Sequence, residues 1–130
     1  MYKNLTFISV LGGLAVLLGA FGAHALKKDL TVAAFQSFET AVQYQMYHTL
    51  LLLIVNINQL FSDKFKRTLT LVFGFGVVMF SGSIYGIHVF RIPAKLIWFL
   101  TPLGGGVLLS GWFLLVYYFF QRIKKFRKKG

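Results

Sequence analysis

Four long apolar stretches follow one another along the chain, separated by short segments rich in lysine and arginine. The first stretch, residues 5–25, holds no charged side chain. At about 1.5 Å per residue, a helix of this length covers the roughly 30 Å of bilayer hydrocarbon. The triplet Ala23-His24-Ala25 imitates a signal-peptide cleavage site, but the apolar run is longer than a signal core. We therefore expect a first transmembrane helix at about residues 5–26.

Two further apolar stretches predict a second helix at about residues 41–61 and a third at about 69–90. The segment before the second helix, residues 31–40, places apolar residues at helical spacing. It predicts a short amphipathic lead-in at the membrane interface that runs directly into the second helix, with Thr31 as N-cap. The charged residues at 63–67 are expected to lie beyond the end of the second helix.

The last apolar stretch, residues 92–120, is longer than one upright helix requires. Thr101 and Pro102 offer a break, because threonine is a good N-cap and proline is tolerated at the first helical position. We expect a fourth helix at about residues 101–120, preceded by a short interfacial or re-entrant piece at 93–100. The alternative is a single tilted helix that is kinked at Pro102.

The composition places these helices in lipid. Hydrophobic residues make up 57% of the 130 residues and charged residues only 13%, so the polar surface is too small to cover a soluble globule. The predicted fold is therefore an all-α polytopic membrane protein, with a four-helix transmembrane bundle in residues 1–121 and a basic tail at 122–130. The absence of cysteine excludes disulfides and thiolate chemistry.

The formal net charge of +11 comes from 14 basic and 3 acidic residues, and its distribution predicts the topology. Ten basic residues fall on the side that holds both termini, and four fall on the other side. The four are Lys27, Lys28, Arg91 and Lys95. By the positive-inside rule, both termini are expected to be cytoplasmic in the cell membrane. The tail is expected to serve first as a topology anchor, and its expected counterions are anionic lipid headgroups rather than nucleic acid.

Small residues recur at helical spacing and predict how the helices pack, because they allow two backbones to approach closely. The expected packing positions are Gly12, Gly19, Gly22, Gly82, Gly86, Gly104, Gly105 and Gly111. The partner across such a face could be another helix of the chain, a second copy or another membrane protein.

Polar side chains gather in the half of the predicted bundle remote from the termini. The candidate ligand-binding residues are His24, Glu39, Gln43, Gln45, His48, Tyr85 and Thr101. Unpaired polar groups are costly in lipid, so these side chains are expected to face inward. They could satisfy one another as a hydrogen-bonded seam that fixes helix register, or they could line a pocket for a small molecule, a lipid headgroup or an ion.

The candidates do not match a metal or catalytic pattern. His24 and His48 could ligate haem, or together with Glu39 a divalent ion, but no HxxxH spacing is present. The chain has only three acidic residues and carries no phosphate-binding loop or dinucleotide fingerprint. We expect no metal, no cofactor and no enzymatic activity.

Four blocks of residues together resemble a known family. They are Gly19–His24, Thr40–His48, Phe80–Tyr85, and Thr101–Gly105 with Gly111-Trp112. In this order, over roughly residues 5–115, the chain resembles the small membrane proteins catalogued as domain of unknown function 423, similar to the animal transmembrane protein 256 group. The resemblance implies a four-helix bacterial inner-membrane protein without a settled molecular activity. The hypothesis is a non-enzymatic accessory or interaction protein that supports the membrane or envelope, and the alternative is binding or transport through the polar pocket.

Overall fold

The computed structural model describes residues 1–128, and within them every regular element is a helix. The elements in chain order are α1 (Tyr2–His24), the short 3₁₀ helix η1 (Leu26–Lys28), α2 (Val32–Ile57), α3 (Asp63–His88), the one-turn α4 (Ala94–Ile97) and α5 (Leu100–Arg127). In the described part of the chain, three segments are long and apolar enough to cross a membrane, namely α1, α3 and the α4–α5 segment Ala94–Arg127. The all-α prediction is confirmed.

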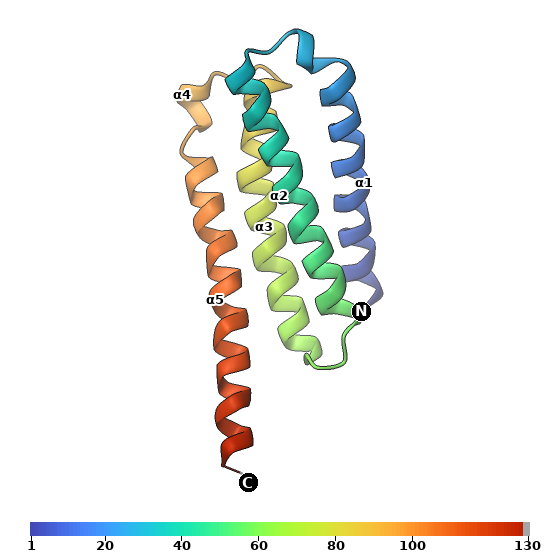
Figure 1. Ribbon diagram of the computed structural model, residues 1–130, viewed down its shortest axis with the longest axis vertical. Helices are drawn as coiled ribbons and strands as arrows, with labels where there is room; N and C mark the ends of the chain where they lie inside the picture. The colour runs from blue at the N-terminus through green and yellow to red at the C-terminus, as the bar shows by residue number, and fades with distance from the viewer. Residues whose placement is uncertain (129–130) are drawn as a thin grey trace.

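The long helices run up and down beside one another (Figure 1). Helix α2 packs between α1 and α3, and α5 packs along α3 on the far side from α1. Both termini and the α2–α3 turn lie at one end of the bundle, here called the terminal end, while η1 and α4 lie at the opposite end. Helix α5 reaches past the other helices at the terminal end.

The core is apolar, and so is much of the outer surface. Leu52, Leu69 and Phe73 are fully buried in a cluster that all four long helices build, and Phe38 centres a smaller cluster near η1. The outward faces of the helices carry large exposed hydrophobic residues, among them Val16, Leu17, Leu71, Phe75, Phe113 and Val116. A soluble protein rarely exposes so continuous an apolar surface, whereas hydrocarbon tails cover it without cost.

The ends of α2 and α3 follow their capping residues. The Thr31 hydroxyl accepts a hydrogen bond from the Ala34 N–H at 3.2 Å, so the predicted N-cap of α2 is confirmed. Helix α2 stops at Ile57 rather than near residue 61, because Asn58 adopts an extended backbone and its side chain accepts the Leu60 N–H. These local bonds end the helix before the charged segment begins.

Helix α3 begins six residues earlier than the expected start at about 69. Ser62 caps it by accepting the Phe65 N–H, and Asp63 adds a negative charge in the first turn, where the helix dipole favours one. The basic residues Lys64, Lys66 and Arg67 therefore belong to the first turns of α3 and not to a loop.

The break before the last helix exists, but the expected N-cap is wrong. The N-cap of α5 is Phe99, and Thr101 is the second helical residue. The Thr101 hydroxyl lies 2.6 Å from the Ser83 hydroxyl of α3, so it serves a contact between helices instead of a cap. Pro102 falls in the first turn, where a backbone N–H has no partner inside the helix, so its ring requires no kink.

The basic tail begins as a continuation of α5 rather than as a separate segment after residue 120. The helix runs to Arg127, and the basic residues of its last turn, Lys124, Lys125 and Arg127, interact favourably with the negative end of the dipole. The Lys124 ammonium also lies 4.6 Å from the centre of the Phe120 ring, one turn back. Residues 129–130 of the predicted tail lie outside the described residues.

Candidate functional site

Gln45 lies at the centre of the polar residues and ties three helices together. From its buried position on α2, its side-chain N–H donates to the Leu11 carbonyl of α1 at 2.7 Å. Its amide oxygen accepts a hydrogen bond from the Tyr85 hydroxyl of α3, also at 2.7 Å. Both ends of the amide are thus satisfied inside the bundle. We call Gln45, His48 and Tyr85 the central seam.

His48 lies one turn further along α2, and its contacts define its protonation state. Its Nδ1 is 2.7 Å from the Tyr44 carbonyl oxygen, which can only accept, so Nδ1 carries the proton. Its Nε2 then accepts the indole N–H of Trp112 on α5 at 3.3 Å, as only the neutral ring can. Because both ring nitrogens are engaged, His48 has no free lone pair for a metal or a haem iron.

Hydroxyl groups connect the remaining helix faces. Ser81 of α3 donates to the Ala41 carbonyl of α2 at 2.7 Å. Ser83 donates to the Phe80 carbonyl within its own helix, so the short Ser83–Thr101 contact is a hydrogen bond that Thr101 donates. Throughout residues 1–128, every buried side-chain nitrogen or oxygen has a hydrogen-bond partner.

The seven candidate residues do not share one cavity. Gln45, His48 and Tyr85 are buried in the central seam, and Thr101 is half-buried between α3 and α5. His24 is exposed at the end of α1. The remaining two, Glu39 and Gln43, are exposed on α2 and face α1 instead of the seam.

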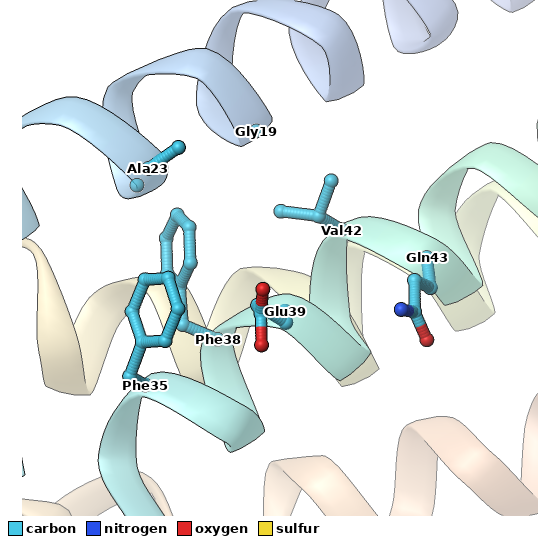
Figure 2. A pocket seen from close by; sticks show the side chains of 8 residues that line it. Gly19, Ala23, Phe35, Phe38, Glu39, Val42 and Gln43 are labelled. Carbon is cyan, nitrogen blue, oxygen red and sulfur yellow. The ribbon is translucent and has the colours of Figure 1, made fainter. Parts of the chain in front are cut away.

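Glu39 and Gln43 line a cavity of about 200 Å³ between α1 and α2 (Figure 2). The rings of Phe35 and Phe38 stand at one end of it, opposite Ala23 of α1. The lining residues are Gly19, Gly22, Ala23, Phe35, Phe38, Glu39, Val42 and Gln43. Within residues 1–128, no three histidine or acidic side chains gather closely enough to hold one metal ion.

The glycines that the sequence singles out lie in different surroundings. A Cβ at Gly104 would collide with the backbone of Phe80, so α3 and α5 approach there as only glycine allows. At Gly111 a Cβ would come within 2.6 Å of the Phe73 ring, and at Gly22 it would overlap the Phe38 ring. These three positions are where the helices pack most tightly.

The other five glycines have more space around them. A Cβ added at Gly12 would lie 3.2 Å from Thr49, and one added at Gly19 would lie 3.4 Å from Val42. A Cβ added at Gly86 would lie 3.0 Å from Ile97, and one added at Gly105 would lie 3.7 Å from Phe80. Gly82 has nothing within 4 Å, so its surface faces away from the chain. Gly76, which is not among the eight predicted packing positions, packs tightly against Leu108.

A second polar group, at the terminal end, was missed. The Asn4 side chain of α1 donates to the Asn56 amide oxygen at 3.0 Å, and the Asn56 side-chain N–H donates to the Thr70 hydroxyl of α3 at 3.0 Å. Asn56 is only 1% exposed. We call Asn4, Asn56 and Thr70 the basal cluster. The available signal was Asn56, directly after the apolar residues 50–55 of the second helix, because a buried amide in a membrane-spanning helix requires a partner.

The basal cluster borders a polar cavity of about 420 Å³. Its lining residues are Met1, Lys3, Asn4, Asn56, Asp63, Lys66 and Arg67. Three basic side chains and one carboxylate therefore face the same space. Lys66 is only 8% exposed, which is unusual for a lysine.

Comparisons with known proteins agree with the resemblance. The model of the family described as protein of unknown function DUF423 matches residues 18–105. A UPF0382 membrane protein of Haemophilus influenzae is 37% identical over 115 residues, covering 88% of this chain and 91% of that protein. The UPF0382 inner membrane protein YgdD of Escherichia coli K12 is 35% identical over 114 residues, covering 86% and 85%.

A Staphylococcus saprophyticus UPF0382 membrane protein is 38% identical over 103 residues, covering 79% of this chain and 84% of that protein. No solved structure matches the chain significantly. The apolar helices, the matched residues and the relatives agree that this is a membrane protein, and the chain belongs to the DUF423 family.

Proposed function

We propose that the chain is a non-enzymatic accessory protein that crosses the membrane four times and acts by packing against other membrane components. The observation that carries this proposal is the closed central seam, in which Gln45, His48 and Tyr85 use their polar groups on one another or on the bundle. A catalytic or transport site needs polar groups that remain free for a substrate. The seam offers none, which also disfavours solute transport through it.

The fourth span in this proposal is α2. Its polar side chains lower its mean hydropathy, but Gln45, His48 and Asn56 are all buried between helices. If α1 and α3 both cross the bilayer in the same direction, the chain must return across it through α2. Residues 1–121 would then form the membrane domain.

The orientation follows from the basic residues. Lys3, Lys66, Arg67 and the basic end of α5 all lie at the terminal end, which we assign to the cytoplasm by the positive-inside rule. The basic residues of α5 between Arg122 and Arg127 would then lie close to anionic lipid headgroups. This proposal keeps both termini on one side of the membrane.

We propose that the partner packs against helix surfaces around glycines that have no neighbouring side chain inside the chain. Gly82 of α3 and Gly106 of α5 are the useful positions, because a Cβ at either one meets nothing within 4 Å inside the chain. A leucine there should leave the fold intact and disturb only an external contact. Gly86 is less suitable, because a Cβ there would lie 3.0 Å from the Ile97 side chain of the same chain.

The test is self-association of the full chain in nanodiscs. Because the chain has no cysteine, one introduced near the C-terminus gives a unique labelling site for energy transfer between copies. Gly82→Leu or Gly106→Leu should reduce the transfer, and Val16→Ala, at an exposed position of α1 away from both glycines, should leave it unchanged. Equal transfer in all four proteins would contradict the proposal that copies of the chain associate through these faces.

A further inference from the structure

The terminal end combines a basic cavity with an apolar groove. The polar cavity beside the basal cluster, here called the basal cavity, is lined by Lys3, Lys66 and Arg67 and by one carboxylate, that of Asp63. A second hollow of about 370 Å³ runs between α1 and α3 and is mostly apolar. Its lining residues are Lys3, Asn4, Phe7, Thr70, Leu71, Gly74, Phe75 and Val78. Lys3 and Asn4 line both spaces, so cavity and groove adjoin.

The groove is apolar and open toward the surroundings of the bundle. Leu71, Phe75 and Val78 are 64%, 60% and 56% exposed, and they succeed one another along the outer face of α3. On the inner side, the Phe7 ring of α1 packs over Gly74, where a Cβ would come within 2.8 Å of it. The groove therefore extends from the basic cavity into the region that hydrocarbon tails occupy.

Charge in the cavity favours an anion. The Lys66 side chain is largely buried, yet it is one of the residues that line the cavity. Its charge must therefore reach the cavity that the side chain lines. Helices α1 and α3 both begin at this end, so the positive ends of their dipoles add to the side-chain charges.

We propose that this site binds one anionic phospholipid, with the headgroup phosphate in the basal cavity and an acyl chain along the α1–α3 groove. Basic pockets between membrane helices on the cytoplasmic side suit such headgroups. The basal cluster holds α1, α2 and α3 together beneath the phosphate, and Asn4 stands where headgroup and chain would join. The inference rests on the four-span topology proposed above and does not require self-association.

The experiment uses the full chain in a non-ionic detergent with an equimolar mixture of phosphatidylglycerol and phosphatidylcholine. Native mass spectrometry gives the ratio of the two bound lipids. The unmodified chain should prefer phosphatidylglycerol, and Lys3→Gln with Arg67→Gln, both at exposed positions, should reduce that preference about tenfold. Lys27→Gln with Lys28→Gln, also at exposed positions, removes the same charge from the opposite end of the bundle and should preserve it. Equal losses in both variants would overturn the site.

The groove and the source of the phosphate are tested separately. Val78→Trp fills the groove from an exposed position and should lower lipid occupancy several-fold, whereas Val116→Trp, at an exposed position of α5, should not. Inorganic phosphate at the same concentration as the lipid should fail to displace phosphatidylglycerol. Efficient displacement would overturn the lipid assignment in favour of a free phosphate site. If the glycine variants reduced energy transfer as expected but the unmodified chain showed no preference for phosphatidylglycerol, the lipid site would be rejected and the proposed function would stand.

Discussion

The central seam and the basal cluster are built from the same kinds of side chain, but they differ in what surrounds them. Both join α1, α2 and α3 through an amide on α2 and a hydroxyl on α3. The seam is closed, with Gln45 and Tyr85 buried on all sides. The basal cluster opens onto a cavity that carries three basic side chains. A buried polar group in this bundle therefore stabilises the fold, and we expect binding to depend on open space and unpaired charge beside it.

The largest expected effect comes from opening the seam at its centre. Gln45→Leu removes the acceptor of the buried Tyr85 hydroxyl and the second hydrogen bond to the Leu11 carbonyl, which keeps its partner within α1. We expect a loss of about 2–3 kcal/mol in the free energy of unfolding, measured by denaturant titration in mixed micelles. Gln43→Leu is the matched control, because that exposed amide on the same helix makes no such bond, and it should change stability by less than about 0.5 kcal/mol. Equal losses would show that the seam is not the stabilising element.

A smaller effect is expected at the basal cluster. Asn56→Leu removes the bonds to Asn4 and Thr70, but the adjoining cavity admits water or headgroups that can replace them. We expect a loss of about 1 kcal/mol in the same titration. Asn4→Leu, at the half-buried edge of the cluster, should cost less still. If Asn56→Leu proved as damaging as Gln45→Leu, the distinction between a closed and an open polar region would fail.

Much of this fold is predictable from the sequence because the signals are long and local. Apolar stretches of membrane length gave the long helices, and Thr31 gave the start of α2. The errors arise where a side chain can either cap its own helix or form a hydrogen bond with another helix. Thr101 has the right type and position for an N-cap, yet it bonds to Ser83, which lies 18 residues away in sequence. Only the packing of α5 on α3 decides between the two.

The candidate site was less predictable for a related reason. Helical spacing places Gln45 and His48 on one face, and both are indeed buried together. Spacing does not reveal whether Glu39 and Gln43, on the same helix, turn toward the seam or toward α1, because that depends on the rotation of α2 against its neighbours. Asn56 falls in the predicted second span, and Lys66 falls in the charged segment predicted to follow it. Local sequence patterns do not show that these two segments pack so that both side chains line one cavity.

The smallest expected effect separates the roles inside the seam. His48→Phe keeps a ring of similar size against Phe73 and removes the acceptor of the Trp112 indole N–H. The bond is long, at 3.3 Å between the two nitrogens, so we expect a loss of only about 0.5 kcal/mol, together with a shift in tryptophan emission as the indole loses its partner. Tyr47→Phe, at the exposed neighbouring position, should change neither. A cellular defect from His48→Phe at unchanged stability would assign this ring a role beyond packing, and the seam would then no longer be purely structural.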